Sequence, residues 1–288
     1  MKNFTKFSLL TFILATILFT SCKKEYESAQ TVDDAAIQSY LKSNNISMDK
    51  SSTGYYYKIN TTGTGDAVKN SDSIYYSYTF KTLGGTVLNQ TSDLMIPGTF
   101  LGYTDRFTIG GTPYVFTPIR EVLAMLKRGG KATLILPSNQ AFGKNGLSAI
   151  NVGSNENILI DLGIYNFTKK YEVDEYEINK FIADKGLTMT KDASRARYSI
   201  TTPGTGTDAI NVNSTIVANY TVRNLDGTVV DSSTDGTFSS ALSGLYKGWQ
   251  LILPGKVTAG GKLRLIIPSD LANGVALDFD IEIVSVTN

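Results

Sequence analysis

The sequence predicts an α+β protein with two similar domains in tandem, each an antiparallel sheet wrapped around a short amphipathic helix. Two observations lead to this prediction. The chain has 288 residues, which exceeds the common size of a single domain. The same order of strands, turns and one short helix also occurs twice, at a separation of 141 to 142 residues. Two copies are too few for a solenoid, so we expect tandem domains.

The repeat is clearest in a strand and the glycine-rich loop that follows it. Residues 57–65 read YKINTTGTG and residues 198–206 read YSITTPGTG, at an offset of 141. Tyr78 then corresponds to Tyr220 at an offset of 142, and one inserted residue near Thr207 explains the difference. The two copies therefore share one order of elements.

The N-terminus predicts export and lipid anchoring. Lys2 and Lys6 precede an apolar run, residues 7–19, that has the character of a secretory signal and is short for a membrane span. A small residue then precedes Cys22, an arrangement that resembles a bacterial lipobox. We expect a lipidated Cys22 that anchors the protein in the bacterial cell envelope, at the outer membrane, facing the periplasm or the surface. The alternative is an ordinary signal peptide with an incidental cysteine, which has no partner for a disulfide.

A short helix is expected to open each copy. Apolar residues recur at helical spacing in both, namely Ile37, Tyr40 and Leu41, then Ile178, Phe181 and Ile182. In the second helix Asp174 and Glu177 suggest a capping-box-like start, and Gly186 suggests the end.

The remaining elements of each copy are strands around one central helix. Aromatic and β-branched residues predict strands over 73–80, 131–136, 214–222 and 262–267. Helices are expected over 118–127 and 245–253. Their apolar faces would be Ile119, Val122, Leu123 and Leu126, and Leu245, Trp249, Ile252 and Leu253.

These elements divide the chain into five parts. We expect a lipoprotein signal peptide (1–22), a tether and short helix (23–50), a first domain (51–168), a connecting helix (169–190) and a second domain (191–288).

Composition argues against several functional classes. The formal net charge is +1 and no basic block follows the N-terminus, so we expect no nucleic-acid partner. The chain has no histidine, which removes histidine triads and histidine metal sites. The loops at 63–65 and 204–208 lack the Lys-Ser/Thr end of a phosphate loop. We expect no cofactor and no metal.

Three acidic residues near the C-terminus alternate with apolar ones. Asp278, Asp280 and Glu282 lie between Leu277, Phe279, Ile281 and Ile283. A period of two sends the acids to one face of a strand, which we expect to be the solvent face. A glycosidase or Ca²⁺ site is the alternative.

The second copy carries a motif set with a known counterpart. Residues 219–233 read NYTVRNLDGTVVDSS, Gly248 and Trp249 follow, and residues 277–283 read LDFDIEI. This set resembles the FKBP-type peptidyl-prolyl cis-trans isomerase family. The resemblance implies the family's fold and an apolar pocket for a proline ring. It implies four catalytic residues, Tyr220, Asp231, Trp249 and Phe279, and three substrate-binding residues, Phe238, Leu245 and Tyr246.

Both copies depart from the family pattern. In the first copy the resemblance implies substrate-binding Tyr78, Val115, Phe116 and Phe142. Leu88, Asn89, Ile119 and Ile160, however, replace the motif Phe, Asp, Trp and closing aromatic residue. This copy keeps the length of the family's flap over 143–157, with Phe142 at the position of the flap tyrosine, and has an extra stretch at about 91–106. In the second copy the flap and its tyrosine are missing.

The leading functional expectation is a cell-envelope peptidyl-prolyl isomerase, with the second domain as its seat. Its substrates would be proline-containing segments of exported polypeptides. The alternative is a non-catalytic polypeptide-binding chaperone or assembly module, and a third possibility is an architectural spacer. The sequence leaves three points open: the oligomeric state, the identity of the client, and whether the first domain covers the pocket of the second.

Overall fold

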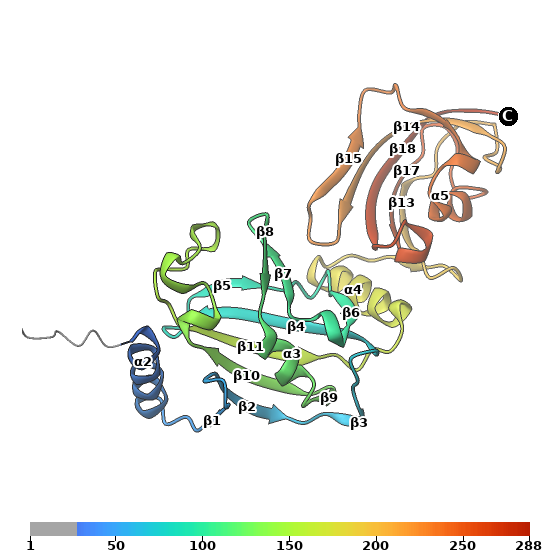
Figure 1. Cartoon of the computed structure of the whole chain (residues 1–288). Helices are drawn as coiled ribbons and strands as arrows, with labels where there is room; N and C mark the ends of the chain where they lie inside the picture. The colour runs from blue at the N-terminus through green and yellow to red at the C-terminus, as the bar shows by residue number, and fades with distance from the viewer. Residues whose placement is uncertain (1–27) are drawn as a thin grey trace, which may run out of the picture.

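The computed structural model describes residues 28–288 and contains two seven-stranded antiparallel sheets (Figure 1). The first has the order β1 (Asp49–Lys50), β2 (Tyr56–Thr61), β10 (Lys131–Leu136), β11 (Ile158–Ile164), β4 (Ser73–Thr82) and β5 (Val87–Gln90), and β6 (Gly98–Phe100) also pairs with β4. The second has the order β12 (Thr190–Lys191), β13 (Arg197–Thr202), β17 (Lys262–Ile267), β18 (Leu277–Thr287), β14 (Thr215–Asn224) and β15 (Val229–Ser233), and β16 (Ser239–Ala241) pairs with β14. The identical topology confirms the predicted α+β tandem.

Four helices and several short pieces complete the two copies. The helices are α2 (Ala29–Ser43), α3 (Thr117–Leu123), α4 (Lys170–Asp184) and α5 (Lys247–Ile252). The first copy also has two small strand pairs, β3 (Thr64–Ala67) with β9 (Lys127–Arg128) and β7 (Arg106–Ile109) with β8 (Thr112–Val115). The 3₁₀ turns are η1 (Leu101–Tyr103), η2 (Ser138–Gln140), η3 (Gly143–Asn145), η4 (Ser148–Ile150), η5 (Leu242–Gly244) and η6 (Ser269–Leu271).

One central helix packs against each sheet, as the apolar periodicity predicts. Helix α3 begins with a proline in its first turn, where no backbone N–H is needed, and ends at Leu123, earlier than expected. The predicted face is fully buried, including Leu126 beyond the helix end. Helix α5 begins at Lys247, so Leu245 lies in the chain before it and is only partly buried. Each helix thus closes one apolar core.

The helices α2 and α4 occupy equivalent places in the two copies. Ile37 and Leu41 of α2 pack on the first sheet, and Ile178 and Phe181 of α4 pack on the second. Both helices carry the same buried polar contact. Asp33 Oδ2 accepts hydrogen bonds from N and Oγ of Ser138 at 3.0 and 2.7 Å, and Asp174 Oδ2 accepts from N and Oγ of Ser269 at 3.1 and 2.7 Å. Each helix is therefore part of the repeating unit.

The expected capping role of Asp174 and Glu177 is wrong. Helix α4 begins at Lys170, and Glu172 accepts the backbone N–H bonds of Thr168 and Lys169 at 2.6 and 3.0 Å. Asp174 and Glu177 lie farther inside the helix and are both buried. Their carboxylates reach other elements, which sequence spacing along one helix does not reveal.

The expected solvent exposure of the acidic row is correct for two residues and wrong for Asp278. Asp280 and Glu282 form exposed ion pairs with Arg223 and Lys262. Asp278 is 1% exposed and receives two hydrogen bonds from Arg264, at 2.8 and 2.7 Å. Helix α4 covers this end of the sheet, and the Phe181 ring lies 5.5 Å from the Arg264 guanidinium carbon. The predicted alternation of acidic and apolar residues is confirmed, but only part of the strand face that carries the acidic residues is exposed to solvent.

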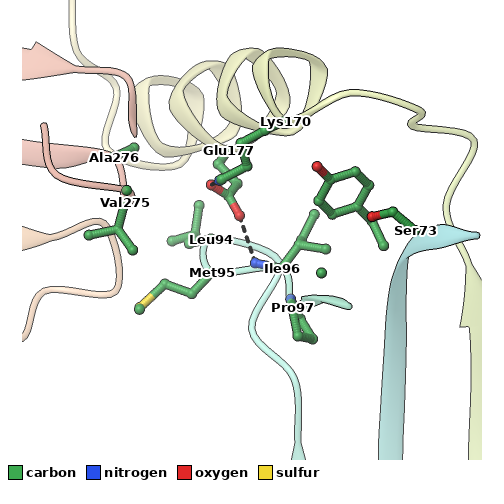
Figure 2. A pocket seen from close by; sticks show the side chains of 12 residues that line it. Ser73, Leu94, Met95, Ile96, Pro97, Lys170, Glu177, Val275 and Ala276 are labelled. Carbon is green, nitrogen blue, oxygen red and sulfur yellow. Dashed lines mark hydrogen bonds and ion pairs between the residues drawn. The ribbon is translucent and has the colours of Figure 1, made fainter. Parts of the chain in front are cut away.

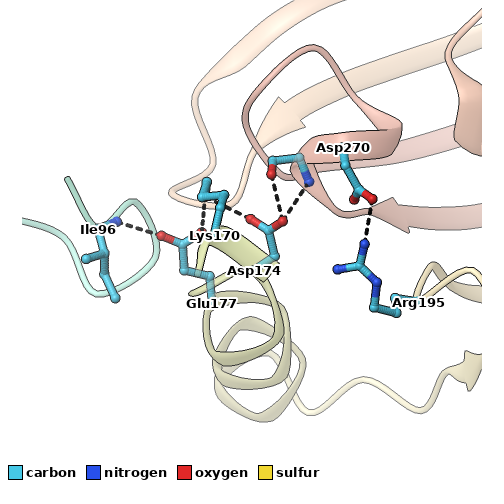
Figure 3. A network of polar contacts seen from close by, with 7 residues as sticks. Ile96, Lys170, Asp174, Glu177, Arg195 and Asp270 are labelled. Atoms are coloured by element: carbon cyan, nitrogen blue, oxygen red, sulfur yellow. Dashed lines mark hydrogen bonds and ion pairs between the residues drawn. The ribbon is translucent and has the colours of Figure 1, made fainter. Parts of the chain in front are cut away.

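Helix α4 also contacts the first copy, and in Figure 1 it lies between the two sheets. Glu177 Oε1 accepts a 2.6 Å hydrogen bond from the backbone N–H of Ile96, in the loop between β5 and β6 (Figure 3). Val173 packs with Ile96 and with Tyr75 of β4. The helix therefore joins the two copies as well as opening the second.

This joint predicts a pH dependence of stability. Burial raises the pKa of Glu177 from its ordinary 4.5 to about 7, although Lys170 lies 3.8 Å away and the Ile96 N–H bond opposes the rise. The folded state therefore holds the proton more tightly than the unfolded state. The free energy of unfolding is expected to fall as pH rises from about 4.5 to about 7, by at most about 3 kcal/mol, and then to level.

Denaturant unfolding at about pH 5 and about pH 8 measures this fall. Glu177→Gln is expected to remove it. Glu172→Gln on the same helix is the matched control and should keep it, because the pKa of Glu172 is lowered by backbone N–H bonds. An unchanged fall in Glu177→Gln would contradict the prediction.

Within residues 28–288 no helix is long and apolar enough to cross a membrane. The predicted signal peptide and the lipidated Cys22 lie outside the described residues.

Candidate functional site

A cavity of about 440 Å³ opens in the second copy between α5 and the strands β14, β15 and β18. It brings together all seven residues that the family resemblance implied for this copy: Tyr220, Asp231, Phe238, Leu245, Tyr246, Trp249 and Phe279. Five further lining residues were not predicted, namely Val222, Gly244, Lys247, Gln250 and Asn273. Period-two alternation along β14 could have indicated Val222, two residues after Tyr220.

Trp249 forms the apolar centre of the cavity wall. Its side chain is 3% exposed and meets Tyr220 and Phe279 edge to face, with ring centroids 6.0 and 5.7 Å apart. Phe238 packs edge to face on Tyr220 at 4.9 Å, and Tyr246 packs on Phe279 at 5.5 Å. Such aromatic arrangements are favourable and rigid, so the cavity is preformed.

The glycine before the tryptophan has a steric reason. A Cβ atom on Gly248 would lie 2.2 Å from Cγ2 of Ile267 on β17. Only glycine allows α5 to approach the sheet this closely. The Gly-Trp pair therefore sets the depth at which the indole lies.

The polar side of the cavity is a hydrogen-bonded pair. The Tyr220 hydroxyl donates to Asp231 Oδ2 at 2.6 Å, and Asp231 Oδ1 accepts the backbone N–H of Ser232 at 2.8 Å. Burial and this bond to Asp231 raise the pKa of Tyr220 to about 12, so the hydroxyl keeps its proton at neutral pH. The site can thus bind an apolar ring beside one oriented polar pair.

Gln250 is a further lining residue, and it fixes the rim of the cavity. Gln250 Nε2 donates to the backbone carbonyls of Ser243 and Leu245, at 3.1 and 2.8 Å. These bonds tie α5 to the chain that enters it. Lys247 adds one cationic side chain to the lining.

The corresponding place in the first copy is filled by an aromatic ring. Strand register pairs Phe80 with Asn89 and Ile160, as Val222 pairs with Asp231 and Phe279. The ring of Phe107 on β7 lies 5.1 Å from Tyr78, 5.5 Å from Phe80 and 5.4 Å from Phe116. Tyr78, Phe80 and Phe116 are the counterparts of residues that line the cavity in the second copy.

The predicted residues of the first copy only partly come together. Phe142 packs on Phe116 at 5.4 Å, within the same aromatic cluster as Tyr78. Val115 is 67% exposed and lies on β8, away from this cluster. It therefore does not join the other three in a common site, because the β7–β8 hairpin points its side chain to solvent.

The extra stretch of the first copy lies later than predicted. The turns η1 and η5 are equivalent. Turn η1 follows β6, which pairs with the start of β4, and η5 follows β16, which pairs with the start of β14. Between this turn and the central helix the first copy has residues 104–116 and the second has only Leu245 and Tyr246. The insertion is therefore the hairpin β7–β8, at about 104–114, and not residues 91–106. Sequence comparison misplaced it because the loop after β5 also differs between the copies.

The two copies also differ where the family has its flap. In the second copy η6 is followed by the short loop Ala272–Ala276, which turns at Gly274 with φ +102° and leads into β18. The first copy has a long excursion with η3 and η4 before β11. The short loop places Asn273 at the cavity of the second copy, and no first-copy residue lines that cavity.

Comparisons with known proteins agree with this arrangement. The sequence model of the family described as FKBP-type peptidyl-prolyl cis-trans isomerase matches residues 206–282. A probable FKBP-type peptidyl-prolyl cis-trans isomerase of Haemophilus influenzae is 27% identical over 120 residues, which are 42% of this chain and 45% of that protein. The chain thus spans less than half the length of this relative.

Two solved structures are similar to the chain. The three FKBP domains of wheat FKBP73 have 16% identity and a TM-score of 0.33, covering 84% of this chain and 99% of that one. FkpA from Escherichia coli has 21% identity and a TM-score of 0.36, covering 56% and 71%.

The fold and the cavity define a protein of two tandem α+β domains, one of which has an open aromatic pocket. The second copy is similar in sequence to the FKBP-type peptidyl-prolyl cis-trans isomerases over residues 206–282. The first copy has the same topology as the second, and its pocket is filled.

Proposed function

We propose that the protein is a peptidyl-prolyl cis-trans isomerase of the bacterial cell envelope that acts on proline-containing segments of exported polypeptides. The observation that carries the proposal is the cavity around Trp249, in which aromatic walls face one hydrogen-bonded polar pair, Tyr220 and Asp231. The family match over residues 206–282 supports the same chemistry.

The cavity suits a reaction that moves no proton. Rotation about an X-Pro bond has a barrier of roughly 18–20 kcal/mol because amide resonance must be broken. A site lowers this barrier when it binds the twisted amide better than either planar form, and each ~1.4 kcal/mol of preference gives a tenfold rate. The apolar walls favour an amide that has lost its charge separation, and the indole of Trp249 offers a flat surface for the proline ring.

The location in the envelope rests on the N-terminal sequence. Residues 1–22 are proposed as a signal peptide and Cys22 as the lipidated residue that anchors the mature protein to a membrane. Partitioning of the protein between detergent and water, with and without Cys22→Ser, tests the anchor.

The catalytic proposal predicts a loss of activity in two pocket variants. The full-length protein should speed cis/trans exchange of a proline peptide. Trp249→Leu removes the aromatic surface and Asp231→Ala removes the partner of Tyr220, and each is expected to lower kcat/KM about tenfold or more. NMR exchange or a coupled cleavage assay measures the rate.

Asp235→Ala is the matched control for Asp231→Ala. Asp235 is exposed, lies in the loop that follows β15 four residues after Asp231, accepts hydrogen bonds from Thr237 and does not line the cavity. Wild-type rates in a folded Trp249→Leu protein would overturn the assignment of the site.

A second candidate function is non-catalytic binding of polypeptides, as a chaperone or assembly module. The short loop Ala272–Ala276 favours it, because a pocket without a long flap can hold a segment while leaving it open to solvent. Suppression of client aggregation without any peptide exchange would select this function. If the protein showed neither peptide exchange nor suppression of aggregation, that result would favour a role as an architectural spacer.

A further inference from the structure

A second cavity, of about 510 Å³, lies between the two copies (Figure 2). One wall is the first-copy segment Leu94–Gly98, and another is helix α4 with Lys170 and Glu177. The third wall is the second-copy segment Gly274–Ala276. We call this cavity the inter-copy cleft. It is separate from the pocket around Trp249, since none of the residues 28–288 lines both.

The walls of the inter-copy cleft are fixed to one another. Glu177 holds the first-copy wall through the backbone N–H of Ile96, and Asp174 holds η6 through Ser269 (Figure 3). Leu94 packs into the cluster formed by α4 and the second sheet, beside Ala276. Both carboxylates are buried, so these contacts are shielded from water. The cleft is therefore preformed.

The chemistry of the cleft suits an apolar side chain. Met95 and Val275 are 38% and 45% exposed, and Figure 2 shows them on the first-copy and second-copy segments that face each other. Lys170 lies 2.8 Å from Asp174 and 3.8 Å from Glu177, so its charge is compensated within the wall. No strong charge is left to select an ionic ligand. Methionine at such a surface adapts to side chains of different shape.

A single short loop contributes lining residues to both the cleft and the pocket. In Ala272–Ala276, Asn273 lines the pocket and the next three residues line the cleft. An extended polypeptide rises about 3.3 Å per residue, so a segment that crosses this loop can present side chains to both cavities.

We propose that the inter-copy cleft binds an apolar side chain of the same polypeptide whose proline occupies the pocket around Trp249. This inference rests on the proposed function, and it adds a substrate preference: an extended segment with an apolar residue at a fixed spacing from the proline. The first copy, whose own pocket is filled, would contribute Met95 to substrate selection.

A peptide series tests the proposal by binding to the full-length protein. Each peptide carries one proline and one leucine placed roughly two to eight residues to either side, and a serine version of each serves as reference. Fluorescence anisotropy gives Kd and NMR exchange gives the isomerisation rate. At one spacing leucine is expected to tighten binding about tenfold. Val275→Asp and Met95→Asp should each abolish that gain.

The matched controls are Val284→Asp and Met125→Asp. Val284 and Met125 are each 44% exposed and line neither cavity, so these variants should keep the gain. Isomerisation that is indifferent to leucine at every spacing would overturn the cleft and leave the proposed function standing. A gain in binding that depends on Val275, without isomerisation, would support the cleft and overturn the catalytic function. Absence of binding by every peptide would overturn the cleft.

Discussion

Replacing Asp278 by alanine is expected to lower the free energy of unfolding by about 3–5 kcal/mol. Asp278 is 1% exposed and accepts both hydrogen bonds of a fork from Arg264, whose pKa is raised mainly by this partner. Phe181 covers the guanidinium, so the variant leaves a partly buried cation without its counterion. Urea unfolding followed by Trp249 fluorescence measures the loss.

Asp280→Ala is the control, because Asp280 lies on the same strand as Asp278 and pairs with Arg223 of β14 while its side chain is 55% exposed. An exposed pair contributes at most about 1 kcal/mol. Equal effects of the two variants would contradict the view that α4 shields Asp278. The double variant of Asp278 and Arg264 to apolar residues should recover part of the loss, since no unpaired charge remains.

Gly248→Ala is expected to destabilise the second copy by about 1–3 kcal/mol and to weaken the pocket. The new Cβ would meet Cγ2 of Ile267 at 2.2 Å, and both atoms belong to packed elements that cannot move apart freely. Helix α5 would have to shift, and Trp249 would shift with it. Unfolding experiments measure the first effect and peptide Kd the second.

Gly244→Ala provides the comparison in the same copy. Its Cβ would have Ser240 Oγ as its nearest neighbour at 3.7 Å, which is an ordinary contact. It should therefore change stability by less than about 0.5 kcal/mol. If Ile267→Ala in the Gly248→Ala background fails to reduce the added cost, the steric explanation is incorrect.

Local patterns were sufficient to predict the repeated fold and much of the pocket. Apolar periodicity indicated the buried faces of α3 and α5, because those residues face a core whatever the tertiary detail. The motif around Tyr220, Asp231 and Trp249 indicated seven lining residues that the structure brings together. A repeat conserves its order of elements, so the shared topology also followed from sequence.

The errors share a cause in contacts between distant elements. Asp278 is buried because α4 crosses the sheet there, and Asp174 and Glu177 bind Ser269 and Ile96 from other elements. The inserted hairpin fills the first pocket with Phe107, whereas the sequence indicated an extra stretch and altered motif residues without placing a ring in the pocket.

Periodicity and motif spacing are properties of the local chain, so they were enough to predict two copies of one α+β unit and pocket residues in the second. That one pocket is open and the other filled, and that a cleft lies between the copies, became visible in the folded protein. These features depend on which side chains meet across elements far apart in the chain, such as Phe107 with Tyr78 and Glu177 with Ile96, and no local pattern encodes such a meeting.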